Sequence, residues 1–134
     1  MDLETRRSRA TAFVEAMPSG VIDLATLADD FDCWNASMGG LISGPTYLEG
    51  IGKAAAALPD MKMIVDGTVA EGGQVAVRSH SEATLPDGSI YRNAYHFLFE
   101  FTGVKIKRVH AFLNTKTAEE KLMSLLWGDR RSFD

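Results

Sequence analysis

The sequence predicts one α+β domain, in which a curved antiparallel sheet wraps around N-terminal helices as a cone-shaped roll. Three observations indicate this fold. Helical periodicity is concentrated in residues 3–58, strand-like alternation fills residues 61–115, and a length of 134 residues suits a single hydrophobic core. Strands of roughly 10 to 13 residues must bend, and a bent sheet that covers helices leaves a cavity. We therefore treat residues 1–134 as one domain with a pocket.

Two helical segments are expected before the first strand. From Leu3 to Met17, apolar side chains recur mainly on one helical face, and Pro18 and Gly20 then end the helix. A shorter apolar repeat predicts a second helix over residues 21–28. The alternation of residues 31–34 is typical of a short strand.

A third helix and a run of strands complete the predicted fold. Glycine and proline residues between 39 and 45 indicate a loop, after which Ser43 or Thr46 can cap a helix from Tyr47 to Leu58. Turn residues then separate four hairpin-connected strands, namely Lys62–Ala70, Gln74–Leu85, Ser89–Phe101 and Lys105–Asn114. A last helix is expected over residues 118–127.

The alternation of the long strands separates an inner face from an outer face. On the third long strand the inner set is aromatic except for one amide: Tyr91, Asn93, Tyr95, Phe97, Phe99 and Phe101. On the preceding strand the inner set is small: Val75, Val77, Ser79, Ser81 and Ala83. Small side chains beside aromatic ones leave room for a ligand. On the last strand, Val109, Ala111 and Leu113 form the apolar set, which assigns His110 to the outer face.

Composition limits the possible partners. The formal net charge is −4 and the Lys and Arg residues are scattered, so the sequence offers no basic footprint for nucleic acid or anionic lipid. No apolar stretch approaches the ~20 residues of a membrane span. With Cys33 as the single cysteine, no intramolecular disulfide can form. These features predict a soluble cytoplasmic protein.

Neither a metal nor a cofactor is expected. His80, His96 and His110 share a face in the predicted sheet, but they lie on three strands without a local ligand motif, and several charged side chains share that face. The sequence also has no phosphate-binding loop, dinucleotide fingerprint or nucleophile motif.

The strand segments resemble a known family. The runs Val75-Ala-Val-Arg78, Leu85-Pro-Asp-Gly-Ser-Ile-Tyr-Arg-Asn-Ala-Tyr-His-Phe-Leu-Phe-Glu-Phe101 and Val109-His-Ala-Phe-Leu-Asn-Thr115 look like the sheet half of SnoaL-like domains. These domains belong to the nuclear transport factor 2-like, or ketosteroid isomerase-like, superfamily. The resemblance extends back through Leu27-Ala-Asp-Asp30 to the first helix, and it implies the same roll with a ligand pocket. Because this superfamily includes both enzymes and proteins without catalysis, the resemblance implies fold more than function.

The acidic residues of the superfamily are missing here. Asn35 occupies the position of the proton-abstracting aspartate of steroid isomerases, and an amide cannot accept that proton. Phe13 and approximately Phe97 stand where those enzymes keep hydrogen-bond donors. The end of the last strand, Ala111-Phe-Leu-Asn114-Thr, carries neutral residues where many SnoaL-like domains carry carboxylates. We therefore do not expect ketosteroid isomerisation of the usual kind.

The remaining candidates are aromatic and neutral polar residues. Tyr95 or Tyr91 is the expected donor to a developing oxyanion, with Asn93 and Asn35 orienting the substrate. Asn93 is either aimed at the ligand in this way or hydrogen-bonded to a neighbouring tyrosine. A base would have to be Asp32 or, if a bulge turns it inward, His110. The residues expected to contact the ligand are Phe13, Trp34, Asn35, Tyr47, Ser79, Tyr91, Phe97 and Ala111.

Three functions stay open at this point. The first is acid/base isomerase, cyclase or hydratase chemistry on a bulky apolar molecule of polyketide, terpenoid or steroid type. The second is a ligand-binding module without chemistry, which the lost carboxylates favour. The third is a structural subunit of a larger oxygenase-type complex. All three are compatible with a homodimer formed through the outer face of the sheet.

Overall fold

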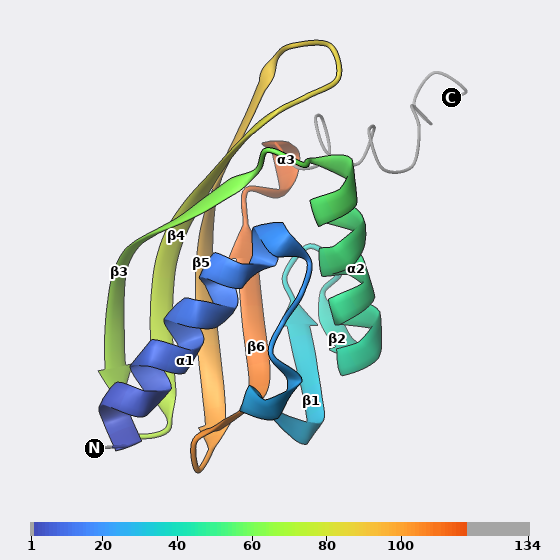
Figure 1. Cartoon of the computed structure of the whole chain (residues 1–134). Helices are drawn as coiled ribbons and strands as arrows, with labels where there is room; N and C mark the ends of the chain where they lie inside the picture. Colours follow the sequence, from blue (N-terminus) through green and yellow to red (C-terminus); the bar gives the residue numbers. More distant parts are fainter. Residues whose placement is uncertain (1, 118–134) are drawn as a thin grey trace.

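The computed structural model describes residues 2–117 as helices packed against one curved sheet (Figure 1). The helical elements are α1 (Asp2–Ala16), the 3-10 turns η1 (Met17–Ser19) and η2 (Leu24–Thr26), α2 (Gly44–Ala57) and the short α3 (Thr115–Thr117). The strands are β1 (Leu27–Asn35), β2 (Gly40–Ser43), β3 (Lys62–Glu71), β4 (Gln74–Thr84), β5 (Ile90–Thr102) and β6 (Lys105–Leu113).

The six strands form one sheet in the order β2-β1-β6-β5-β4-β3. Strands β3 to β6 follow one another as antiparallel hairpins, as the turn residues predict. β1 lies beside β6 and runs parallel to it, with Asn35 opposite Ala111. The chain reaches this parallel pairing because α2 and the β3–β5 meander separate β1 from β6 in sequence. β1 thereby brings Asn35, its last inward-facing residue, next to Ala111 near the end of β6.

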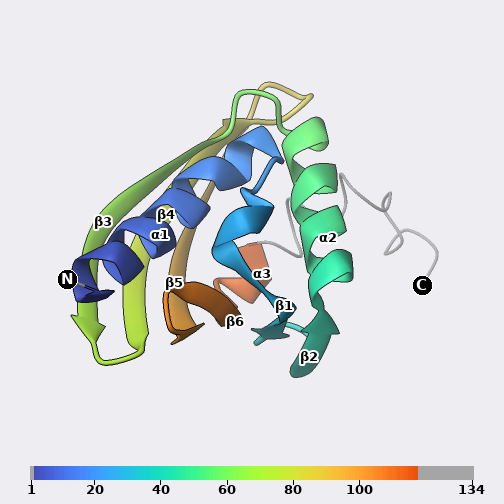
Figure 2. The same cartoon turned by 60° about the horizontal axis from the view of Figure 1, so that its bottom comes forward.

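The sheet curls around α1, which confirms the α+β cone-shaped roll (Figure 2). β3 and β4 bend over the helix, and the register between them shifts from Val65 to Gly67, where a bulge increases the local bend. A second shift lies between Glu100 and Phe101 in the β5–β6 pair. These irregularities allow strands of 10 to 13 residues to wrap around a helix instead of remaining flat.

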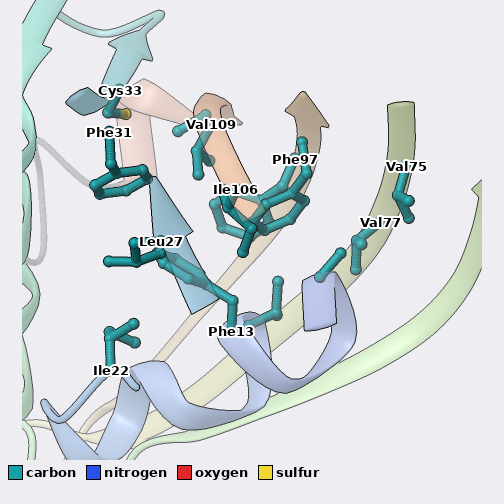
Figure 3. Packing of buried hydrophobic residues seen from close by; sticks show 14 of the residues in the cluster. Phe13, Ile22, Leu27, Phe31, Cys33, Val75, Val77, Phe97, Ile106 and Val109 are labelled. Carbon is teal, nitrogen blue, oxygen red and sulfur yellow. The ribbon is translucent and has the colours of Figure 1, made fainter. Parts of the chain in front are cut away.

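The core lies between α1 and the inner face of the sheet (Figure 3). Phe13 of α1 is 3% exposed and contacts an aromatic ring on each side. Its ring centroid lies 5.4 Å from that of Phe99 and 6.1 Å from that of Phe31, and its plane stacks on Tyr47 of α2. Burying a side chain of this size stabilises the fold by roughly 1.5–3 kcal/mol. Phe13 therefore joins both helices to the sheet.

The strand alternation was predicted correctly. On β4, the inner residues Val75, Val77, Ser79, Ser81 and Ala83 are each 3% exposed or less. On β5, Tyr91, Asn93, Phe97 and Phe99 are buried, while Arg92, Ala94 and His96 between them are exposed. β6 buries Val109 and Ala111, so the apolar set of this strand faces inward as expected.

Several element boundaries differ from the sequence-based expectation. The second helix is only the turn η2, which Asp23 caps by accepting from the Ala25 N–H at 3.0 Å, and β1 already begins at Leu27. Residues 40–43, expected as loop, form β2 because the glycine turn before them returns the chain antiparallel to β1. The helix expected over residues 118–127 lies outside the described residues.

Both longer helices begin and end close to where the sequence predicts. The Ser43 hydroxyl accepts from the Thr46 N–H and caps α2, with Pro45 in the first turn. A Cβ atom at Gly44 would collide with the backbone carbonyl oxygen of Phe31, so only glycine allows α2 to start this close to β1. The close start places the Tyr47 ring over the inner face of the sheet.

Arginine side chains attach α1 to the turns of two hairpins. Arg6 donates from Nε to the Gly103 carbonyl at 2.7 Å and from Nη1 to the Gly72 carbonyl at 2.8 Å. Arg9 donates to the Val104 carbonyl at 2.6 Å. The N-terminal half of α1 thus holds the β3–β4 and β5–β6 turns together, while Ala10, Phe13 and Val14 further along the helix enter the core. Within residues 2–117, no helix is long and apolar enough to cross a membrane.

Candidate functional site

A cavity of about 430 Å³ lies between α2 and the inner face of the sheet. Its wall is mostly apolar, with a few hydrogen-bonding groups. The lining residues are Met17, Asn35, Met38, Ile42, Thr46, Tyr47, Glu49, Gly50, Ile51, Lys53, Ala54, Leu58, Met61, Met63, Tyr91, Tyr95, Phe97, Ala111 and Leu113. A cavity of this volume and polarity is typical of small-molecule sites in proteins.

Neighbouring residues of the sheet provide the space for this cavity. Asn35, Ala111 and Phe97 lie side by side on β1, β6 and β5, because each is the register partner of the next. Ala111 is the smallest of the three, so a hollow remains between the amide and the ring. Tyr95, two residues before Phe97 on β5, lies on the same inner face, and the two stacked rings have their centroids 5.7 Å apart.

Four polar side chains form a hydrogen-bonded chain at one end of the cavity. The Asn93 side-chain amide donates to Tyr91 Oη at 2.8 Å. Tyr91 Oη lies 3.3 Å from Tyr95 Oη, which in turn lies 2.9 Å from Ser81 Oγ. Tyr91 and Tyr95 line the cavity, whereas Asn93 and Ser81 stand behind them. The chain therefore connects buried polar groups to the cavity wall.

Asn93 is positioned by the backbone. Its Oδ1 accepts from the Ala94 N–H at 2.8 Å and from the Asn114 N–H at 3.1 Å. Both partners can only donate, so the amide oxygen must face them and the NH₂ group must face Tyr91. Asn93 is 5% exposed and does not line the cavity. The sequence left open whether Asn93 orients a ligand or is hydrogen-bonded to a neighbouring tyrosine, and in the structure it donates to Tyr91.

The cavity tyrosines keep their protons. Burial is the main cause that raises the pKa of Tyr95 far above its ordinary value, and the neighbouring Tyr91 adds to this effect. Burial also raises the pKa of Tyr47 well above the usual value, with a further contribution from the Cys33 thiol. At neutral pH both phenols are therefore hydrogen-bond donors and not bases.

The Tyr47 hydroxyl is enclosed in the protein wall. The ring of Tyr47 is half-buried and lines the cavity, but its Oη is buried without a hydrogen bond of normal geometry among the described residues. The nearby Cys33 thiol is at most a weak partner. Ser79 Oγ is the second buried hydroxyl without a partner in this part of the chain. Burial raises the pKa of Cys33 to about 12, so this thiol is not a reactive nucleophile.

Asn35 is the last residue of β1 and lines the cavity. Its Oδ1 accepts from the Ser37 N–H at 2.9 Å and from the Ser37 hydroxyl, which makes a local turn after the strand. Its backbone oxygen accepts from the Gly39 N–H at 2.9 Å. The Asn35 side chain is half-buried and faces inward, in phase with Phe31 and Cys33.

The two candidate bases lie on the outer face of the sheet. The Asp32 carboxylate receives Nε–H and Nη2–H bonds from Arg108 at 2.7 and 3.0 Å, and this pairing lowers the pKa of Asp32. His110 Nε2 lies 2.7 Å from Glu100 Oε2, and no bulge turns the imidazole inward. Neither side chain lines the cavity.

The structure brings half of the expected residues together. Asn35, Tyr47, Tyr91, Tyr95, Phe97 and Ala111 all line the cavity. Phe13 and Ser79 belong to the buried interior instead, and Trp34 lies outside, with its ring 6.2 Å from that of His110. Trp34 lies between Cys33 and Asn35 on β1. Because successive side chains of a strand point to opposite faces, Trp34 faces outward while its two neighbours face inward.

Sequence analysis missed four methionines in the cavity wall, namely Met17, Met38, Met61 and Met63. Met61 and Met63 lie close together at the start of β3, but Met17 and Met38 lie far from them in sequence, so no single periodicity relates all four. An excess of Met was the only available signal, because this flexible side chain is common at adaptable binding surfaces.

Glu49 and Lys53 of α2 were also missed by the sequence analysis. Their side chains form an ion pair at 3.6 Å beside the cavity. Among residues 2–117, no group of three or more His, Cys, Asp or Glu could hold a metal ion.

The fold has counterparts among solved structures. The chain is similar to AclR of Streptomyces galilaeus, a candidate hydroxylase, with 17% identity and a TM-score of 0.76 over 94% of this chain and 87% of that one. It is similar to IdmH of Streptomyces antibioticus, a candidate polyketide cyclase, with 19% identity and a TM-score of 0.75 over 87% and 97%. For PrhC of Penicillium brasilianum the identity is 17% and the TM-score 0.77, over 94% and 90%.

Identities below one in five show a shared fold and no more. No curated protein matches the sequence. The model of the SnoaL-like domain family, in contrast, matches residues 10–109, which span the second half of α1 and most of the sheet. This match confirms the resemblance found in the strand segments, and the chain belongs to the family of SnoaL-like domains.

Proposed function

We propose that this protein binds a bulky, mostly apolar molecule of polyketide, terpenoid or steroid type and acts on it by acid/base chemistry of the isomerase, cyclase or hydratase kind. The observation that carries the proposal is the chain Asn93–Tyr91–Tyr95–Ser81, which ends at the wall of an otherwise apolar cavity. A mostly apolar cavity with a few hydrogen-bonding groups suits a ring system that carries a carbonyl group.

One direction of the hydrogen bonds leaves Tyr95 free to donate. The Asn93 NH₂ group can only donate to Tyr91 Oη, and we propose that Tyr91 in turn donates its proton to Tyr95 Oη. Tyr95 then accepts from Tyr91, and its own proton can leave Ser81 for a ligand oxygen. In a reaction through an enolate, negative charge would develop on that oxygen. Donation from a phenol that stays protonated stabilises this charge in a water-poor site.

The cavity wall offers no desolvated base among the described residues. Among the described residues that line the cavity, Glu49 is the only carboxylate, and its side chain is 70% exposed and paired with Lys53. Asp32 and His110 face the opposite side of the sheet. This arrangement favours, as the second candidate function, a module that binds the same class of ligand without converting it.

One experiment separates the two functions. The purified protein is screened by thermal shift against steroid diketones, terpene epoxides and anthraquinone-type polyketides, and each stabilising compound is then followed by mass spectrometry. Conversion that Tyr95→Phe slows by about one to three orders of magnitude supports the enzyme. Stabilisation without conversion supports the binding module. If no compound raises the melting temperature, both proposals fail.

As a control, Asp32→Asn and His110→Asn should leave turnover within about twofold of the original protein, because their side chains point away from the cavity. A loss comparable to that of Tyr95→Phe in either variant would mean that the base acts from the outer face, which contradicts the proposed geometry.

We also propose that two copies pair through the outer face of the sheet. A row of register partners crosses this face from edge to edge: Leu41, Trp34, His110, Leu98, Ala76 and Val69. Five of the six are apolar, and Leu41 and Val69 at the two ends are 58% and 71% exposed. A row of this kind supports a sheet-to-sheet homodimer.

A further inference from the structure

The Asn35 amide at the end of β1 has a fixed orientation. The Ser37 backbone N–H is a donor without acceptor capacity, so the group 2.9 Å from it must be the amide oxygen. The Ser37 hydroxyl donates to the same oxygen. Rotating the amide by half a turn would place its NH₂ group against the Ser37 N–H and break that bond. The orientation is therefore set by the local turn and does not depend on a ligand.

The other side of this amide is available to a ligand. Nδ2 has no hydrogen-bond partner among residues 2–117, and it does not belong to the enclosed polar atoms of this region. Asn35 lines the cavity beside the small Ala111 side chain, its register partner on β6. An NH₂ group offers two protons and no lone pair for accepting a hydrogen bond.

We propose that Asn35 is a fixed hydrogen-bond donor that selects an acceptor oxygen on the ligand, such as a ketone, quinone or enolate oxygen. This inference rests on the proposed function, since it concerns the same cavity. It means that the cavity offers two separate donors, Tyr95 Oη and Asn35 Nδ2.

The spacing of these donors restricts the ligand further. Tyr95 lies on β5 and Asn35 on β1, with β6 between them. The backbones of these strands are two inter-strand steps, about 10 Å, apart, and this spacing favours a ligand with two acceptor oxygens over a ligand with one. The ligand that we infer is therefore a rigid ring system with two acceptor oxygens, such as a diketone.

The test replaces the donor by an acceptor of nearly the same shape. In Asn35→Asp, a carboxylate oxygen still accepts from Ser37, so the turn is kept, but the second oxygen repels a ligand carbonyl. Gln74→Glu is the control, because it makes the same chemical change on an exposed side chain of β4 outside the cavity. The probes are androst-4-ene-3,17-dione and the fluorescent N-phenyl-1-naphthylamine, which has no oxygen.

We expect Asn35→Asp to weaken binding of the dione about tenfold or more, as for a lost hydrogen bond to a buried acceptor. Binding of the oxygen-free probe should change less than threefold, and Gln74→Glu should change neither. Asn35→Leu should fall between the original protein and Asn35→Asp. Unchanged or tighter binding of the dione to Asn35→Asp would overturn this inference while leaving the proposed function intact. If the original protein binds neither probe, the proposed function fails and the inference fails with it.

Discussion

The Asn93 amide and the Tyr91 hydroxyl, two residues apart on β5, are joined by a hydrogen bond of 2.8 Å behind the cavity wall. The amide is itself held by two backbone N–H groups, one of them at Asn114 just after β6. It thereby attaches the end of β6 to the inner face of β5. A polar side chain on an aromatic face is stable here because each of its groups has a partner.

Asn93→Ala should reduce the free energy of unfolding by about 2–4 kcal/mol, because it leaves the Ala94 and Asn114 N–H groups without an acceptor and removes the donor to Tyr91 Oη and the Asn114 carbonyl. Urea denaturation monitored by tryptophan fluorescence measures this loss. His96→Ala, an exposed position on the same strand, is the control and should cost less than about 0.5 kcal/mol. Equal effects of the two substitutions would show that Asn93 has no structural role.

Ser79 and Ser81 form a matched pair on the inner face of β4, with exposures of 1% and 0%. Ser79 Oγ has no partner among the described residues, whereas Ser81 Oγ is bonded to Tyr95. Ser79→Ala should therefore be neutral or stabilising by up to about 1 kcal/mol, and Ser81→Ala destabilising by about 1 kcal/mol or more. Melting curves of the two variants provide the comparison, and the reverse order would contradict the hydrogen bonding described here.

The ion pair between Asp32 and Arg108 predicts a pH dependence of stability. The hydrogen bond from Arg108 lowers the pKa of Asp32, so the folded state binds this proton less readily than the unfolded state. The contribution is then fully present above the unfolded pKa of about 3.9 and is lost as the pH falls through the lowered folded pKa.

Asp32→Asn should consequently cost about 1 kcal/mol at neutral pH, and the difference from the original protein should shrink in acid below about pH 4. Urea midpoints measured across this range provide the profile. The control is Asp30→Asn, whose carboxylate is 70% exposed, so its pairing with Lys107 should contribute little. A difference that grows towards low pH would give the wrong sign and refute the assignment.

The two carbonyl bonds of Arg6 predict a role in holding the hairpin turns to α1. Arg6→Met keeps most of the aliphatic stem but removes both bonds, and it should destabilise the fold by about 1–2 kcal/mol. Amide hydrogen exchange should increase at the β3–β4 and β5–β6 turns. Arg92→Met, which removes an exposed pair with Glu82, is the matched control and should change neither quantity appreciably.

The homodimer proposal predicts that Leu98→Glu, in the middle of the apolar outer row, produces a monomer. Light scattering coupled to size-exclusion chromatography measures the mass. Buried between two sheets, the added carboxylate would lose its hydration without gaining a partner. Ser8→Glu, at an exposed position of α1 away from the outer face of the sheet, is the control for added negative charge. A monomeric original protein would rule out the dimer.

Much of the fold follows from local patterns. The alternation on β4 and β5 correctly predicted which side chains face inward, because neighbouring residues of a strand point to opposite faces. Prediction was less accurate around residues 21–43. A short apolar segment there is compatible with either a helix or a strand, and β1 becomes a strand because β6, about 75 residues later in the sequence, pairs with it.

For the site, the sequence by itself determined the kind of wall: aromatic rings, small residues and neutral polar groups, without the acids of steroid isomerases. It also placed Tyr91, Tyr95 and Phe97 on one face, because their spacing is local. Only the tertiary structure decided that the Asn93 amide donates to Tyr91 and that Asp32 pairs with Arg108 on the outer face of the sheet. It also decided that four methionines from different parts of the chain line one cavity. The physical reason is that hydrogen bonds, ion pairs and cavities depend on distances between elements, and sheet curvature and strand register set these distances only when the chain is folded.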